Sequence, residues 1–194
     1  MSDTGELLLR LLLIVNPLAA LLVWSSLSAP LVPRTRPRLG ALAVGLAFVG
    51  LALAALLADR LLDLLSVSPP TWQMAAGALL IFAAFPVFLA RDPFLREPYG
   101  SERTLPRWAV ARLACGLANP AALAALVVYG AEFARGPVLI ALFLVLVLTG
   151  AGVARADALE RRVGRLPLRE GGRVLAALLV LMSVAMIVDA VNSV

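Results

Sequence analysis

The chain alternates between long apolar runs and short polar or charged stretches. Six apolar runs approach the length of about 20 residues that a helix needs to cross the hydrocarbon core of a bilayer. They lie at residues 7–28, 39–58, 72–90, 108–130, 137–154 and 174–191. This pattern predicts an all-α membrane protein with six transmembrane helices.

Two of these runs carry the same polar interruption near their centre. "LLLIVNPLAALLVW" (11–24) contains Asn16-Pro17, and "CGLANPAALAALVVYG" (115–130) contains Asn119-Pro120. Proline lacks the amide hydrogen that an interior helix residue donates, and Asn followed by Pro is typical of a helix start, with Asn as the N-cap. We therefore expect the first and fourth helices to be broken at Asn-Pro, with a second half-helix starting inside each span.

Superposing the two Asn-Pro sites indicates an internal repeat. "NPLAALLVW" matches "NPAALAALVVY", "ADRLLDLLSVSP" at 58–69 matches "ADALERRVGRLP" at 156–167, and "QMAAGALLIF" at 73–82 matches "RVLAALLVLM" at 173–182. The matches keep the same order and near-equal spacing. Because each copy has three helices, the second copy enters the membrane from the opposite side, which predicts a 3+3 inverted-topology repeat.

The repeat predicts the domain organisation. Residues 1–194 form a single integral membrane domain, with repeat one at 1–92, repeat two at 106–194 and a cytoplasmic linker at 91–107.

Composition supports membrane insertion and narrows the chemistry. Hydrophobic residues make up 62% of the 194 residues, against about 45–50% apolar residues in soluble domains. The chain has no His, and Cys115 is its only cysteine, which excludes His-based metal sites, a Ser-His-Asp triad and a two-thiol redox relay. We expect no metal site, no cofactor and no enzymatic activity, and no nucleotide-binding loop is present for direct use of ATP.

All basic residues are arginines, and they gather in alternate loops. The loops after the first, third and fifth predicted helices contain "APLVPRTRPR", "RDPFLREPYGSERTLPR" and "RADALERRVGRLPLREGGR", whereas the intervening connections have only Arg60 and Arg135. Cytoplasmic loops beside membrane spans retain positive charge, so both termini are expected to face outward. The net charge of +5 then belongs to these loops and does not point to nucleic acid. The last of the three loops predicts either a short amphipathic helix on the inner surface or an extended end of the fifth helix.

The Asn-Pro sites supply the candidate substrate-binding residues: Asn16, Pro17, Asn119, Pro120 and Ala121. The N–H groups and positive dipole end of a half-helix suit a carboxylate, while freed carbonyls can accept hydrogen bonds from an ammonium group or bind a cation. The alternative is that each Pro only kinks its helix and each Asn links neighbouring helices.

Asp189 is a weaker candidate, for binding a coupling ion. An acid inside a membrane span is costly and often functional. The interpretation preferred on structural grounds is that Asp189 and Arg10, both expected toward the outer side, neutralise each other.

The segments "LLLIVNPLAALLVW", "LLDLLSVSPPTWQMAAGALLIFAAFPVFL" and "GGRVLAALLVLMSVAMIVDAVNSV" resemble the MarC family of six-helix bacterial inner-membrane proteins, placed with the lysine-exporter superfamily. The resemblance covers nearly the whole chain. It implies a 3+3 inverted repeat with outward termini and, from some members, cation-coupled transport of small neutral amino acids such as alanine and glycine.

The chain departs from the family at two places. Where the family usually has Gly-Pro-Gly-Ala, residues 119–122 read Asn-Pro-Ala-Ala, and Gln73 stands where Arg is typical.

These observations predict a secondary transporter of a small solute, most simply a small neutral amino acid, driven by H⁺ or Na⁺ and working by alternating access around the paired Asn-Pro breaks. The alternative is a non-transporting membrane scaffold or assembly partner in which the Asn-Pro sites are packing kinks. The expected partners are the lipid bilayer and the solute; a homo-oligomer and the direction of transport are left open by the sequence.

Overall fold

The computed structural model describes residues 3–89 and 106–193. Within these ranges the chain folds into helices and has no strand. In chain order the helices are α1 (Asp3–Val15), α2 (Pro17–Ser28), α3 (Arg36–Leu56), α4 (Ala58–Leu65), α5 (Pro69–Leu89), α6 (Pro106–Leu117), α7 (Pro120–Glu132), α8 (Arg135–Ala154), α9 (Ala156–Val163) and α10 (Arg165–Asn192). The predicted linker at 91–107 lies almost wholly outside the described residues.

The described helices include five that are long and apolar enough to cross a membrane. They are Gly5–Ser28, Arg36–Leu56, Pro69–Val87, Arg135–Ala154 and Arg165–Asn192, and a sixth span results if α6 and α7, which are bent by 46° at their junction, are counted together. These positions agree with the apolar runs. The main difference is that α10 starts at Arg165 rather than at 174, because the charged residues before the apolar run are also helical.

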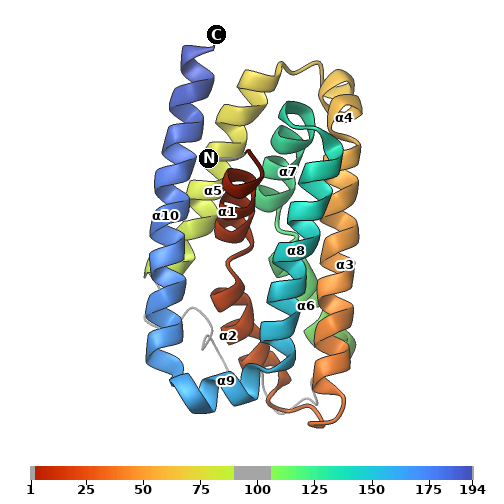
Figure 1. Cartoon of the computed structure of the whole chain (residues 1–194), viewed down its shortest axis with the longest axis vertical. Helices are drawn as coiled ribbons and strands as arrows, with labels where there is room; N and C mark the ends of the chain where they lie inside the picture. The colour runs from red at the N-terminus through yellow and green to blue at the C-terminus, as the bar shows by residue number, and fades with distance from the viewer. Residues whose placement is uncertain (1–2, 90–105, 194) are drawn as a thin grey trace.

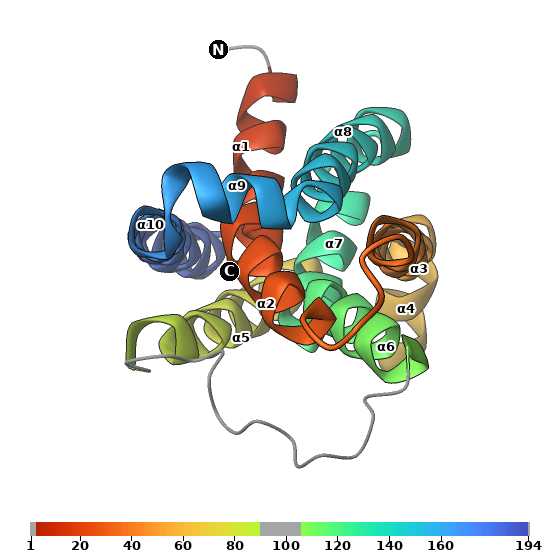
Figure 2. The same ribbon diagram turned by 90° about the horizontal axis from the view of Figure 1, so that it is seen from below.

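The spans stand side by side, and two short helices mark opposite ends of the bundle (Figure 1). We call these ends the α4 end and the α9 end. Viewed from the α9 end, α7 lies in the interior, among α1, α3, α5 and α8 (Figure 2). An unbroken stretch of α7, residues 124–130, is buried, because alanines and a glycine allow neighbouring helices to approach from several directions.

Two contacts show how closely α7 is held. A Cβ atom built on Gly130 would lie 2.2 Å from the carbonyl oxygen of Ala55 in α3, so the backbones of the two helices almost touch there. On the other side, the indole Nε1 of Trp72 in α5 donates a hydrogen bond to the carbonyl oxygen of Ala124 at 3.1 Å. The interior helix is therefore fixed both by steric fit and by a polar link.

The outward faces of the long helices are apolar. Exposed large hydrophobic residues follow α3, α8 and α10; they include Leu42, Leu46, Val49, Leu53, Ile140, Phe143, Leu144, Val147, Leu148, Val174, Leu181, Val184 and Val188. An exposed apolar surface of this extent marks contact with lipid or with another protein. Together with the length of the helices, it supports a bilayer as the surroundings of this bundle.

The first part of the third basic loop forms a separate helix rather than an extension of the fifth span. α8 ends at Ala154, α9 begins at Ala156, and Gly164, with φ of 83°, joins α9 to α10. The corresponding helix α4 follows α3 in the first half of the chain. α4 was not predicted from the sequence, although the match between 58–69 and 156–167 pointed to this segment.

Arg36 ties the α9 end together. Its guanidinium donates to the carbonyl oxygens of Ala29 and Leu31 at 2.9 and 3.1 Å and to Asp157 of α9 at 2.7 Å. One side chain thus closes the turn between α2 and α3 and connects it to the second half of the chain.

We expect Arg36→Ala to destabilise the protein more than Asp157→Asn does. Removal of the carboxylate charge weakens one partly exposed ion pair, which is worth about 0.5–1 kcal/mol. Removal of the guanidinium also takes away the donors to two carbonyls, each adding about 1 kcal/mol. Thermal unfolding of both single variants and the double variant in detergent checks this. Equal losses from the two single variants would contradict the role assigned to the carbonyl contacts.

Candidate functional site

Asn16 lies between α1 and α2 and connects them to α10. Its backbone has φ of 43°, in the left-handed region. Its side-chain Oδ1 accepts a hydrogen bond from the amide of Ala19 at 3.2 Å, which caps α2, and its Nδ2 donates to the carbonyl oxygen of Gly172 at 3.1 Å. Asn16 is therefore both a helix cap and a link to a helix from the other half of the chain.

Asn119 holds the corresponding place between α6 and α7, but its bonds are local. Its Oδ1 accepts from the amide of Ala122 at 2.9 Å, and its Nδ2 donates to the carbonyl oxygen of Gly116 at 3.1 Å. In a continuous helix the amide at position 120 would donate a hydrogen bond to the carbonyl oxygen of Gly116. Pro120 has no amide hydrogen and cannot form this bond. The Asn119 side chain thus replaces the hydrogen bond that its own proline removes.

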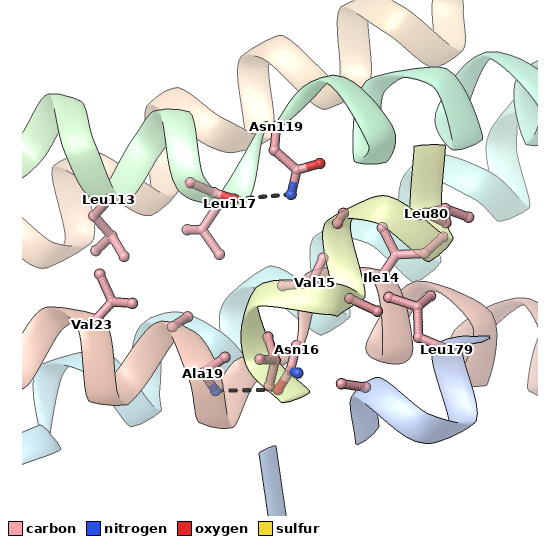
Figure 3. Close-up of a pocket in the computed structure, with 16 residues that line it drawn as sticks. Ile14, Val15, Asn16, Ala19, Val23, Leu80, Leu113, Leu117, Asn119 and Leu179 are labelled. Carbon is pink, nitrogen blue, oxygen red and sulfur yellow. Dashed lines mark hydrogen bonds between the residues drawn. The ribbon is translucent and has the colours of Figure 1, made fainter. Parts of the chain in front are cut away.

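Both asparagines line one cavity of about 190 Å³. Figure 3 shows their side chains on opposite sides of it, with Val23 and Leu113 facing each other farther along. The cavity is formed by residues of α1, α2, α5, α6 and α10 together with the two asparagines; the lining is Ile14, Val15, Asn16, Ala19, Ala20, Val23, Leu80, Ala83, Ala84, Val87, Leu113, Gly116, Leu117, Asn119, Ala176 and Leu179. Two sites separated by about half the chain therefore meet at the same space.

The two amides are the only polar side chains in this lining, and no charged side chain belongs to it. A primary amide has two N–H donors and an oxygen that can accept two hydrogen bonds. Within the described residues each of the two amides makes one bond as donor and one as acceptor. Each retains capacity to bind a small polar ligand while it caps its helix.

The other predicted binding residues lie outside the lining. Ala121 is buried in the first turn of α7, Pro120 is exposed, and Pro17 is half-buried in the first turn of α2. None of them borders the cavity. They shape the helix starts, whereas the cavity wall is built by other side chains.

Sequence reasoning missed the contribution of α5 and α10. Leu80, Ala83, Ala84 and Val87 of α5, and Ala176 and Leu179 of α10, form a large part of the wall. α5 and α10 are the third long helices of the two predicted repeats. The repeat pattern could have indicated them, because binding sites in such proteins lie at the interface of the repeats.

Asp189 and Arg10 are not paired with each other. Asp189 is exposed on α10 and does not line the cavity. Arg10 instead forms an ion pair with Glu6, one turn earlier in α1, and its guanidinium carbon lies 5.9 Å from the ring centre of Tyr129 in α7. Glu6 and Arg10 lie one turn apart on the same helix, a spacing at which opposite charges commonly pair.

The comparisons with known proteins give one match. No curated protein and no solved structure matches the chain. The family model of MarC family integral membrane proteins matches residues 1–194, the whole chain. The chain therefore belongs to the MarC family of integral membrane proteins.

Proposed function

We propose that this protein is a secondary transporter of a small solute, with a small neutral amino acid such as alanine or glycine as its substrate and H⁺ or Na⁺ as the coupling ion. The observation that carries the proposal is the cavity that both asparagines line, between helices of the two halves of the chain. A site at the interface of two halves is where alternating-access transporters bind their substrates. The substrate itself is taken from the family resemblance.

The order of the helices supports an inverted repeat at 1–92 and 106–194. α1 to α5 have 13, 12, 21, 8 and 21 residues, and α6 to α10 have 12, 13, 20, 8 and 28 residues in the same order. The equivalent short helices α4 and α9 lie at opposite ends of the bundle (Figure 1). Opposite placement is what a duplication of three spans requires, because the second copy starts on the other side of the membrane.

We assign the α9 end to the cytoplasm of a bacterial inner membrane. Arg34, Arg36, Arg38 and six further arginines between 155 and 173 lie at this end, in the connections, in α9 or near the starts of α3 and α10. The connections at the α4 end have Arg60 and Arg135, and Arg135 is paired with Asp59 at 2.7 Å. This asymmetry favours retention of the α9 end on the inner side, with both termini outside.

The cavity suits a small zwitterion without a charged side chain. The half-helices α2 and α7 begin at Pro17 and Pro120, and the positive ends of their dipoles attract a carboxylate. The amides of Asn16 and Asn119 can donate to it or accept from an ammonium group. The apolar remainder of the wall limits the substrate to a small side chain. Asp189 lies outside the cavity, so a role in coupling would require it to attract the cation before binding.

Uptake into proteoliposomes tests the proposal. Labelled alanine and glycine are supplied under imposed H⁺ or Na⁺ gradients, and we expect gradient-dependent uptake. In the double variant Asn16→Ala, Asn119→Ala the uptake should fall at least about tenfold, since each lost hydrogen bond to a charged ligand group contributes about 1.5–3 kcal/mol. Asn192→Ala is the matched control, because Asn192 is exposed at the end of α10; it should transport normally.

Correct folding of each variant is established first, from its size-exclusion profile in detergent. Unchanged uptake kinetics in the double variant would show that the proposed site is wrong. Absence of uptake under every gradient would remove alanine and glycine as substrates. Absence of stabilisation by a broad set of solutes would then favour the scaffold alternative, in which the asparagines act only as caps and links.

A further inference from the structure

The cavity extends from the asparagines in both directions. Toward the α4 end it is lined by Ile14 and Val15 of α1 and by Ala176 and Leu179 of α10, and toward the α9 end by residues of α2 and α6. α2 contributes Ala19, Ala20 and Val23, all after Asn16, and α6 contributes residues before Asn119. α5 contributes only residues from Leu80 onward, in the half that approaches the α9 end. α7, which leads from Asn119 to the α4 end, contributes none of its own residues to the wall.

The side toward the α4 end is filled by side chains of α1 and α7. Leu7 and Leu11 of α1 and Leu126 and Tyr129 of α7 each have at most 1% of their surface exposed. Close packing of this kind leaves no passage for a solute. In this structure the cavity is therefore closed toward the α4 end.

Arg10 of α1 and Tyr129 of α7 are in contact in this packed region. The guanidinium of Arg10 lies over the ring of Tyr129, with 5.9 Å between Cζ and the ring centre, within the range of a cation–π interaction. The ion pair with Glu6 keeps the guanidinium in place from its own helix. The Tyr129 hydroxyl points to Sδ of Met182 in α10 at 4.0 Å. Tyr129 thus connects α7 with both α1 and α10.

The hinge for a movement of α1 is also present. α1 and α2 meet at Asn16, whose left-handed backbone departs from helical geometry, while the bond from Asn16 Nδ2 to Gly172 anchors the start of α2 to α10. α1 can rotate about this residue without disturbing that anchor. Such a movement would separate Arg10 from Tyr129 and open the packed region.

We infer that Arg10 and Tyr129 form the gate that closes the cavity toward the α4 end. The inference rests on the proposed transport function but can be tested without it. In the state with the gate open, α1 leaves α7, the Arg10–Tyr129 contact is broken, and the cavity is reached from the α4 end. A cation–π contact suits a gate, because it can break and re-form during each cycle.

Cysteine accessibility tests the gate. Cys115, which is exposed, is first replaced by Ser, and Ala19→Cys then places a reporter thiol in the cavity wall. A small membrane-impermeant thiosulfonate is applied to right-side-out and to inverted membrane vesicles, and Asp63→Cys on α4 serves as the marker of sidedness. We expect slow labelling of the reporter from the α4 side in the parent protein.

Gate variants raise this rate and leave labelling from the α9 side unchanged. Tyr129→Ala and, independently, Arg10→Gln should raise the rate of labelling from the α4 side by about tenfold, the effect of losing one such contact on the population of the open gate. Tyr129→Phe keeps the ring beneath the guanidinium and Arg10→Lys keeps the cation, so both should stay close to the parent. Leu9→Ala, on the exposed face of the same helix, is the matched control.

Parent-like labelling of both Tyr129→Ala and Arg10→Gln from the α4 side would overturn the gate. Arg10→Gln removes little volume, so it remains informative where Tyr129→Ala does not fold. Labelling needs no transported solute. Faster labelling in the gate variants without uptake of alanine or glycine would uphold the gate and reject the transport proposal. Uptake that depends on Asn16 and Asn119, with unchanged labelling in the gate variants, would uphold transport and reject the gate.

Discussion

Replacement of Gly130 with alanine is expected to destabilise the protein by about 3 kcal/mol, the upper part of the range for overpacking a tightly fitted core. The added Cβ would lie 2.2 Å from the carbonyl oxygen of Ala55 and 2.9 Å from its carbonyl carbon. Both are backbone atoms of α3, so no side-chain rotation can relieve the clash. The two helices would have to separate, which would open the buried surface around α7. Thermal unfolding in detergent measures the loss.

Gly45→Ala is the matched control for this prediction. Gly45 is also an interior residue of a spanning helix, but a Cβ built there meets nothing within 4 Å. Alanine has a higher helix propensity than glycine by about 1 kcal/mol, so this variant should be as stable as the parent or slightly more stable. Similar unfolding temperatures for the two variants would show that α3 and α7 are not packed as described.

Asn16→Ala is expected to cost about 2–3 kcal/mol, and more than Asn119→Ala. The variant loses the cap of α2, worth about 1 kcal/mol, and the link to Gly172, about 0.6 kcal/mol for a hydrogen bond between membrane helices. It also places alanine at φ of 43°, a conformation that costs residues with a Cβ atom about 1 kcal/mol. Chemical or thermal unfolding in micelles provides the comparison.

Two variants separate these contributions. Asn16→Gly removes the same hydrogen bonds but accepts the left-handed backbone, so it should recover about 1 kcal/mol relative to Asn16→Ala. Asn119→Ala keeps an ordinary backbone, with φ of −68°, and should lose about 1 kcal/mol through its cap. If Asn119→Ala proves to be the less stable variant, the link between Asn16 and α10 contributes less than the structure indicates.

The two Asn-Pro sites therefore differ in what they connect. Asn119 repairs the break in its own helix, whereas Asn16 reaches across to α10. α6 and α7 bend by 46°, while Gly5–Ser28 continues as one span through Asn16. For a protein proposed to alternate between two states, this difference locates the firmer anchor at α2 and α10 and leaves α1 as the movable segment.

The sequence by itself determined the class of the protein and the position of its spans. The number of residues needed to span a bilayer and the apolar character of those residues are both local properties of the sequence. Each run of about 20 apolar residues can therefore be recognised without knowledge of its neighbours in the fold. The same holds for Asn16 and Asn119, because the preference of Asn-Pro for a helix start depends on a few adjacent residues. The resemblance to the MarC family also followed from the sequence and was confirmed by the family match.

Only the tertiary structure decided which side chains share a space. It places Asn16 and Asn119 at one cavity, adds Ala84 and Leu179 to its wall, and leaves Ala121 outside. It also joins Arg10 to Glu6 and Tyr129 rather than to Asp189. The direction of a side chain around its helix follows from the backbone, but its neighbours depend on how helices distant in sequence pack against one another. That packing is a property of the whole bundle, and no single segment encodes it.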